Sequence, residues 1–150
     1  MRTGGVVACV AALLASGCGP PEIETGDLRD ADARACSALV ADLPDTLSGE
    51  TAVEVAGDAA YGAAWGDPAI VLTCGVDAVD ISEAPPCVVA DGVGWVTPET
   101  EGDATLTADG YRPRVRLVVP EDYLPEGSAA ALAELAGPIK EHLELEERCL

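Results

Sequence analysis

The densest β-type apolar run in the middle of the chain lies at residues 70–73, inside the segment YGAAWGDPAIVLTCGV at residues 61–76. Its side chains are aliphatic or β-branched, which favours a buried strand. A Gly-Asp-Pro sequence precedes the run and predicts a turn, because proline fixes φ and aspartate bonds its own backbone. Trp65 stands at this corner and is expected to cap the core. The alternative is that Trp65 and Asp67 line a ligand site.

Two amphipathic helices are predicted, one on each side of the strand-rich part. The first starts at a cap, Asp30 or Asp32, and runs to about Leu43. The second is capped by Ser128, and Pro138 is expected to kink or restart it. Apolar residues at three- and four-residue spacing give each helix one buried stripe. These residues are Cys36, Leu39, Val40 and Leu43 in the first helix and Leu132, Leu135, Ile139 and Leu143 in the second.

Between the helices, short apolar runs separated by Gly, Pro and Asp predict about five mostly antiparallel strands. Two Asp-Gly pairs, at residues 91–92 and 109–110, suit the mirror-image turns that match strand twist. The second pair leads into the longest predicted strand, residues 111–119. Helix, strands and helix together predict a single, disulfide-stapled α+β domain at residues 31–150.

Residues 1–17 are interpreted as a signal peptide and are set aside from the fold. Arg2 supplies a minimal positive region, and residues 6–14 form an apolar segment too short to span a bilayer. The sequence LASGC at residues 14–18 resembles a lipobox, the recognition site of bacterial lipoprotein signal peptidase. The resemblance implies cleavage before Cys18 and a diacylglyceryl group on its sulfur. The alternative is an ordinary secretory signal that is cut nearby.

Residues 18–30 are acidic and contain prolines. We expect this segment to be a flexible tether of roughly 20 Å. The whole chain has 27 acidic and 8 basic residues and a net charge of −19. Because Arg2 is the one charged residue of the signal peptide, its removal changes the net charge from −19 to −20. Such a charge excludes nucleic acids and anionic membrane surfaces as direct binding partners. The expected location is the outer face of the cell membrane, with the lipid as the anchor.

Cysteine usage agrees with a location outside the cytoplasm. Cys18 takes the lipid, and four further cysteines remain after the signal peptide, which predicts two disulfides. The favoured pairing is Cys74 with Cys87 and Cys36 with Cys149. The alternative role of these thiols is to bind zinc. However, no two of the cysteines are closely spaced, and the chain has one histidine.

Motifs for catalysis are missing from the sequence. The single histidine, His142, lies among glutamates on the last predicted helix and is interpreted as a solvated surface residue. The serines lack a nucleophile-elbow context, and no phosphate-binding or dinucleotide-binding glycine loop occurs. Asp27, Asp30 and Asp32 are placed to touch calcium, but their segment lacks the glycine and closing glutamate of a loop site. We therefore predict no catalytic residue, metal or cofactor.

One cationic pattern stands out in this acidic chain. Arg112, Arg114 and Arg116 alternate along the longest predicted strand and are therefore expected to share a face. The functional interpretation is an anion contact with a phospholipid headgroup, a phosphorylated wall polymer or an acidic partner. The favoured structural interpretation is an outer strand face whose arginines pair with neighbouring acids such as Asp103.

Four blocks of the sequence resemble an actinobacterial envelope family catalogued as domain of unknown function 3515. They are residues 35–39 with 43–46, residues 64–76, residues 91–95 and residues 115–120. The most specific is AWGDPAIVL followed by CGV at residues 64–76, although Thr73 stands where the family carries a basic residue. Trp95 ends the third block and, like Trp65, is a candidate for packing or ligand contact. The resemblance implies a secreted or lipid-anchored envelope protein and brings no known activity, substrate or catalytic residue.

These features favour a lipid-anchored binding or interaction module of the cell envelope that is not an enzyme. Its partners would be the membrane, through the anchor, and an unidentified envelope protein or polymer. One alternative is an envelope hydrolase that uses two carboxylates, since a glycosidase needs only one such pair. However, pairs arise by chance among 27 acidic residues. The other alternative is a carrier of a small ligand.

Overall fold

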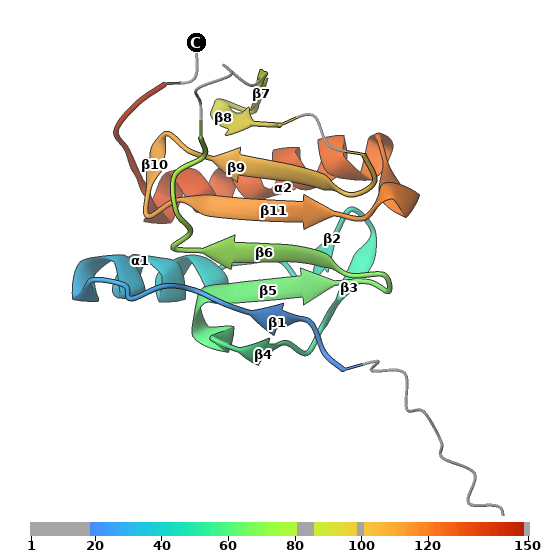
Figure 1. The fold of residues 1–150 in the computed structure, drawn as a ribbon, viewed down its shortest axis with the longest axis horizontal. Coiled ribbons are helices and arrows are strands. Elements are labelled where there is room, and N and C mark those ends of the chain that lie inside the picture. The colour runs from blue at the N-terminus through green and yellow to red at the C-terminus, as the bar shows by residue number, and fades with distance from the viewer. Residues whose placement is uncertain (1–18, 81–85, 99–100, 149–150) are drawn as a thin grey trace, which may run out of the picture.

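A computed structural model describes residues 19–80, 86–98 and 101–148 of the chain. In this part, two helices pack on one face of an eight-stranded sheet (Figure 1). The α+β class, the antiparallel pairing and the two flanking helices are confirmed. The predicted number of five strands is wrong, because several strands are only two to four residues long and leave no clear alternating pattern.

The strands of the large sheet lie in the order β2-β3-β5-β6-β11-β9-β8-β7, and every neighbouring pair is antiparallel. Their bounds are β2 Thr46–Leu47, β3 Glu50–Val53, β5 Gly62–Trp65, β6 Ile70–Cys74, β7 Cys87–Ala90, β8 Val93–Val96, β9 Ala104–Ala108 and β11 Val115–Val119. Two short pairs lie outside this sheet. They are β1 (Glu22–Ile23) with β4 (Ala56–Gly57), and β10 (Tyr111–Arg112) with β12 (Glu144–Leu145).

Both long helices cover the same face of the sheet, which we call the inner face. Helix α1 spans Asp30–Ala41 and α2 spans Glu126–His142, and two single 3-10 turns, Ala59–Tyr61 and Glu121–Tyr123, complete the described elements. Ser128 does not cap α2, because the helix begins two residues earlier and the Ser128 hydroxyl donates to the Pro125 carbonyl at 2.7 Å. The helix runs through Pro138 without a restart. None of the described helices is long and apolar enough to cross a membrane.

The core lies between the inner face and the helices. Alternate residues of each central strand point inward, as expected for a sheet with one covered face. Those of β6 and β11 are fully buried: Ile70, Leu72, Cys74, Val115, Leu117 and Val119. Trp65 and Trp95 are also buried, and the indole N–H of Trp65 donates to the Pro44 carbonyl at 2.9 Å. The two large rings thus fill a core in a chain that has no phenylalanine.

A disulfide joins Cys36 of α1 to Cys74 at the end of β6, with an Sγ–Sγ distance of 2.04 Å. The predicted pairing of Cys74 with Cys87 and of Cys36 with Cys149 is therefore wrong. That prediction assumed that neighbouring segments pair, whereas the fold lays the buried stripe of α1 over β6. Cys87 is also disulfide-bonded, and its partner lies outside the described residues, as does Cys149.

Most of the predicted tether is part of the fold. Ile23 of β1 is only 1% exposed, and it packs on the outer face of the sheet, opposite the helices. A Cβ at Gly62 would lie 2.7 Å from Ile23 Cδ1, so glycine is required at this contact. A Cβ at Gly75, whose φ is +87°, would lie 2.5 Å from Leu28 Cδ2. Residues 19–21 alone separate Cys18 from β1. Three residues span about 10 Å when fully extended.

Candidate ligand-binding site

The three alternating arginines do not lie on one strand. Pro113 interrupts the long strand predicted at residues 111–119, because proline has no N–H to donate and a fixed φ. Arg112 belongs to β10, which pairs with β12, whereas Arg116 belongs to β11 of the large sheet. The prediction of one continuous strand that carries the three arginines is therefore wrong.

Arg112 and Arg114 stabilise local structure. Arg112 donates to the carbonyl oxygens of Asp109 and Tyr111, each at 2.7 Å, and its Nε lies 2.9 Å from a Glu146 carboxylate oxygen. Arg114 Nε lies 2.7 Å from Asp109 Oδ1, although its N–H is not aligned for a hydrogen bond with that oxygen. Both arginines thus hold the turn that begins at Asp109.

Asp103, the acid expected to pair with this arginine face, accepts the Glu121 backbone N–H at 3.2 Å. The structural interpretation thus holds for Arg112 and Arg114, with Glu146 and Asp109 as the acids that lie beside them.

Arg116 differs from both. It is exposed at the centre of the outer face, and its side chain makes no ion pair or hydrogen bond with any other described residue. Its two neighbours across the sheet are Thr73 of β6 and Thr107 of β9. These two threonines are largely buried, at 7% and 2% exposure, so Arg116 has a polar neighbour on each adjacent strand.

Two segments cross the outer face and line a groove together with Arg116. We call residues 22–28 the N-terminal strap and residues 75–79 the β6 strap. Both lie on the side of the sheet opposite α2 (Figure 1). Between them is a groove of about 270 Å³, with Thr105, Thr107 and Arg116 on its floor. Residues 24–26 and 75–79 form its two walls, and Pro98 also lines it.

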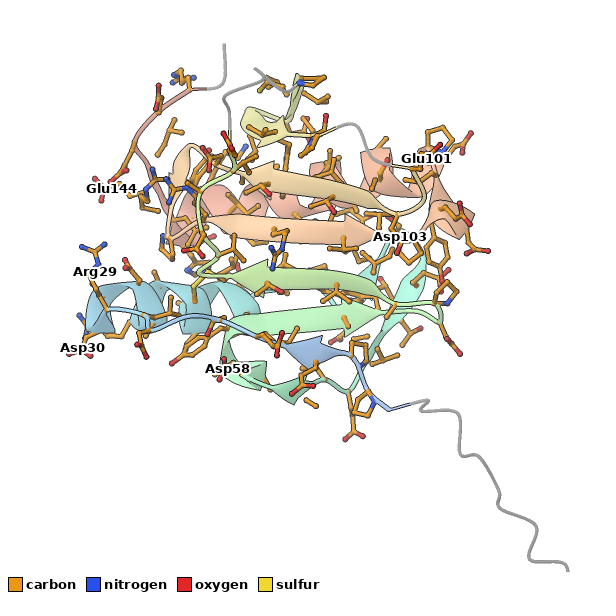
Figure 2. The ribbon with its side chains drawn as sticks, viewed as in Figure 1. Arg29, Asp30, Asp58, Glu101, Asp103 and Glu144 are labelled. Carbon is orange, nitrogen blue, oxygen red and sulfur yellow. A yellow bond between two sulfur atoms is a disulfide. The ribbon has the colours of Figure 1, made fainter. Side chains whose placement is uncertain are left out.

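Both straps are held in place by hydrogen bonds to other segments of the fold. In the N-terminal strap, the backbone N–H and the hydroxyl of Thr25 donate to Asp58 Oδ2 at 3.1 and 2.9 Å (Figure 2). The β6 strap begins with two N–H groups that donate to the Arg114 carbonyl, and ends where the Val79 N–H donates to Asp109 Oδ1 at 3.2 Å. The groove therefore exists before a ligand arrives, which lowers the entropy cost of binding.

The groove carries charges of both signs. Arg116 is the cation among its lining residues, and Glu24 and Asp77 are the carboxylates, each exposed on a different strap. A guanidinium with planar N–H donors can bind carboxylate or phosphate oxygens in pairs. The threonine hydroxyls on the floor can donate or accept.

The other predicted ligand residues lie elsewhere. Trp65 and Trp95 are in the core, and Asp67 is exposed in the turn before β6. The hydroxyl of Tyr123 donates to the Pro68 carbonyl in this turn at 2.9 Å. Desolvation by burial, followed by the charge of Glu50, raises the pKa of Tyr123. The structure does not bring Trp65 and Asp67 together in a pocket with Arg116.

His142 and Asp32 of the predicted calcium segment have partners within the chain. His142 is not freely solvated, because its side chain is 22% exposed and its Nε2 lies 3.1 Å from Asp42 Oδ2. Glu141 is close enough to share a cation with this pair, but the contact between His142 and Asp42 itself accounts for the geometry. In the predicted calcium segment, Asp32 accepts two hydrogen bonds from Arg29. The hydrogen bond, with the charge of Asp32, raises the pKa of Arg29.

Comparison with known families shows which family the chain belongs to. The family model of DUF3515, described as a protein of unknown function, matches residues 3–148. The chain belongs to the DUF3515 family. The resemblance seen in the sequence is thereby confirmed. A search of curated proteins and a search of solved structures each found no match. The DUF3515 description assigns no activity. A function for this chain is therefore inferred from the residues that line the groove.

Sequence reasoning missed the groove of this DUF3515 protein, although it singled out Arg116. The missing information was the path of the two straps, which places residues 24–26 and residue 77 beside β11. One signal was present in the sequence. Thr73, Thr105 and Thr107 occupy alternate, outward positions of two apolar strands, which marks a polar patch on the outer face.

Proposed function

We propose that this DUF3515 protein is a lipid-anchored, extracytoplasmic binding module that takes the anionic group of its ligand at Arg116. The lipobox-like sequence at residues 14–18 supports the anchor at Cys18. The buried Cys36–Cys74 disulfide supports an oxidising compartment, where such bonds form and persist. Lipidation and location are thus proposed from two independent features of the chain.

The single observation that supports a binding function is that Arg116 has no ion pair or hydrogen bond with another described residue. Acidic residues outnumber basic ones 27 to 8, so partners for a cation are abundant. Arg112 and Arg114 have such partners, whereas Arg116 lies open in a groove within the described part of the chain. An open guanidinium between fixed walls is suited to bind an external carboxylate or phosphate.

The residues that line the groove are better suited to binding than to catalysis. Hydroxyls, one guanidinium and two carboxylates are recognition groups. The nucleophile that reacts most readily at neutral pH, a cysteine thiol, is excluded at the three described cysteines by disulfides. His142 lies at the end of α2, away from the groove lining. One observation supports a hydrolase as the second candidate, namely that Glu24 and Asp77 face the same groove from opposite straps.

Anion binding is tested with ethyl phosphate and acetate, followed by NMR on the chain from residue 19 to 150. We expect Arg116→Gln to remove the binding that the wild type shows, because the guanidinium is replaced by a neutral amide. Arg34→Gln is the matched control, since Arg34 is exposed on α1, far from the groove lining. Equal binding by wild type and Arg116→Gln would contradict the proposal.

Anchoring is tested by Cys18→Ser in the full chain. We expect the wild type in the membrane fraction with an acyl-group mass on its N-terminal fragment, and the variant in the soluble fraction, because stable anchoring needs covalent acyl chains. A variant that remains membrane-bound would contradict the anchor.

The hydrolase alternative is tested with Glu24→Gln and Asp77→Asn, assayed against envelope glycans. Turnover by the wild type that either substitution abolishes would favour the enzyme over the binding module.

A further inference from the structure

The charge pattern of the groove says more about the ligand than Arg116 alone. With Arg116, Glu24 and Asp77 as its charged lining residues, the groove has one positive and two negative groups, a formal charge of −1. A simple anion would gain the guanidinium contact but would lie beside two carboxylates, in a chain whose overall charge is −19. Like charges that face each other across an interface disfavour a partner and so contribute to specificity.

We infer that the groove takes a zwitterion, with a phosphate or carboxylate on Arg116 and an ammonium group between the carboxylates of the straps. This inference rests on the proposed function, because it uses Arg116 as the anion contact. An ammonium group offers three N–H donors, which match the carboxylates of Glu24 and Asp77 and the hydroxyls of Thr105 and Thr107. Each charge of the ligand then has a partner of opposite sign.

The size of the groove restricts the ligand further. Its volume is about 270 Å³. Sites for drug-sized ligands usually begin at roughly 300 Å³, so the groove suits a smaller molecule. An amino acid or a phosphoethanolamine group fits this space. Both place an ammonium and an anionic group a few bonds apart.

Two sources supply this chemistry, a soluble zwitterion and the headgroup of an ethanolamine phospholipid. The anchor makes the second source accessible. Glu24 follows Cys18 by six residues. An extended chain of this length spans about 20 Å, which limits the distance between the proposed lipid attachment and the groove wall. Because β1 and the Thr25–Asp58 hydrogen bonds fix the N-terminal strap, the groove stays near the membrane surface when Cys18 carries the lipid.

The test compares two ligands that share a phosphate and differ in the ammonium group, phosphoethanolamine and ethyl phosphate. The protein is the chain from residue 19 to 150, which contains every described helix and strand. Binding is measured by NMR titration at low salt. We expect phosphoethanolamine to bind at least about tenfold more tightly than ethyl phosphate, and Arg116→Gln to lose both ligands.

Substitutions on the straps test the ammonium contact separately from the anion contact at Arg116. Glu24→Gln combined with Asp77→Asn should bring the ratio of the two affinities close to one and should leave ethyl phosphate bound. Asp27→Asn is the matched control, because Asp27 lies on the N-terminal strap but outside the groove lining, and we expect it to keep the ratio.

The outcomes are distinguishable. If ethyl phosphate binds as tightly as phosphoethanolamine and Arg116→Gln loses both, the zwitterion inference is overturned and the anion site remains. If neither ligand binds, or if Arg116→Gln binds both unchanged, the proposed function fails as well. Flotation with phosphatidylethanolamine vesicles and with phosphatidylcholine vesicles identifies the source of the ligand. Retention on phosphatidylethanolamine vesicles alone assigns the lipid headgroup, because choline has no N–H to donate. Binding of free phosphoethanolamine and alanine without vesicle retention assigns a soluble zwitterion.

Discussion

The two faces of the large sheet are built from the same strands but have different chemistry. On β6, Leu72 points inward and Thr73 outward, and on β11, Leu117 points inward and Arg116 outward. Helices cover the inner face, and the inward residues of the central strands β6 and β11 are fully buried. Two straps cover the outer face only in part and leave a polar groove between them. Alternation along a strand thus separates the residues that stabilise the fold from those available for a ligand.

This comparison has a measurable consequence. Substitutions on the inner face should change the free energy of unfolding, and substitutions in the groove should change binding with little effect on that free energy. Unfolding in urea, followed by tryptophan fluorescence or circular dichroism, measures the first quantity.

The largest effect is expected for Trp65→Ala on the inner face, where the indole also donates to the Pro44 carbonyl. Truncation of a buried tryptophan costs about 3–5 kcal/mol, and loss of a hydrogen bond adds about 1 kcal/mol. The urea midpoint should therefore fall sharply, or the variant should fail to fold. Trp65→Phe, which keeps most of the apolar volume, is the control and should lose less than half as much. A Trp65→Ala variant with a nearly unchanged midpoint would show that Trp65 is not a core residue.

Removal of the Cys36–Cys74 disulfide should have the next largest effect. The cysteines are 38 positions apart. Closing a loop of this length stabilises by about 4 kcal/mol in the chain-entropy model. We expect Cys36→Ala with Cys74→Ala to lower the free energy of unfolding by a similar amount. Peptide mapping without reduction is the direct check on the pairing. A peptide that joins Cys74 to Cys87 would contradict the structure.

A smaller effect is expected where the N-terminal strap meets the sheet. Ile23→Ala removes a buried side chain near the start of the described chain. We expect a loss of about 2 kcal/mol, at the low end for such truncations. The exposed neighbour Glu22 supplies the control, Glu22→Ala. This control should lose less than about 0.5 kcal/mol, as is usual for surface substitutions. If both variants unfold like the wild type, residues 22–28 are a free tether and the groove has no N-terminal wall.

The smallest effects separate the arginines from one another. Arg114 lies 2.7 Å from Asp109, which also accepts the Val79 N–H. Arg114→Gln should therefore cost about 1 kcal/mol. Arg116→Gln should stay within about 0.5 kcal/mol of the wild type while losing the ligand. Added salt should reduce the difference for Arg114→Gln, because it screens the ion pair. A larger loss of stability for Arg116→Gln than for Arg114→Gln would indicate that Arg116 has a structural role.

The sequence predicted the elements that have strong local patterns. Both helices, the buried run at residues 70–73 and the Asp91-Gly92 hairpin are present in the structure, and both turn residues of that hairpin have positive φ. Prediction failed where the outcome depended on distant contacts. The sequence of β5, Gly-Ala-Ala-Trp, has no pattern that predicts a strand, and pairing with β3 and β6 makes it one.

The candidate site was predictable only in part. Arg116 stands out in the sequence by its charge, but its place on a different strand from Arg112 depends on Pro113, which interrupts the strand. The walls of the groove come from residues 24–26 and 75–79, which are brought together by the Leu28–Gly75 contact and by hydrogen bonds to Asp58 and Asp109. No local pattern encodes such contacts between segments about 50 residues apart.

Ligand binding in the groove is tested most directly by an amide chemical-shift map of the chain titrated with phosphoethanolamine. We expect the perturbed amides to lie on the outer face, at Thr107, Arg116 and the strap residues Gly26 and Asp77, and the amides of α1 and α2 to keep their chemical shifts. The map should lose these perturbations in Arg116→Gln. Perturbations confined to the helices or to β7, or a spectrum that does not change at saturating ligand, would contradict a binding site on the outer face.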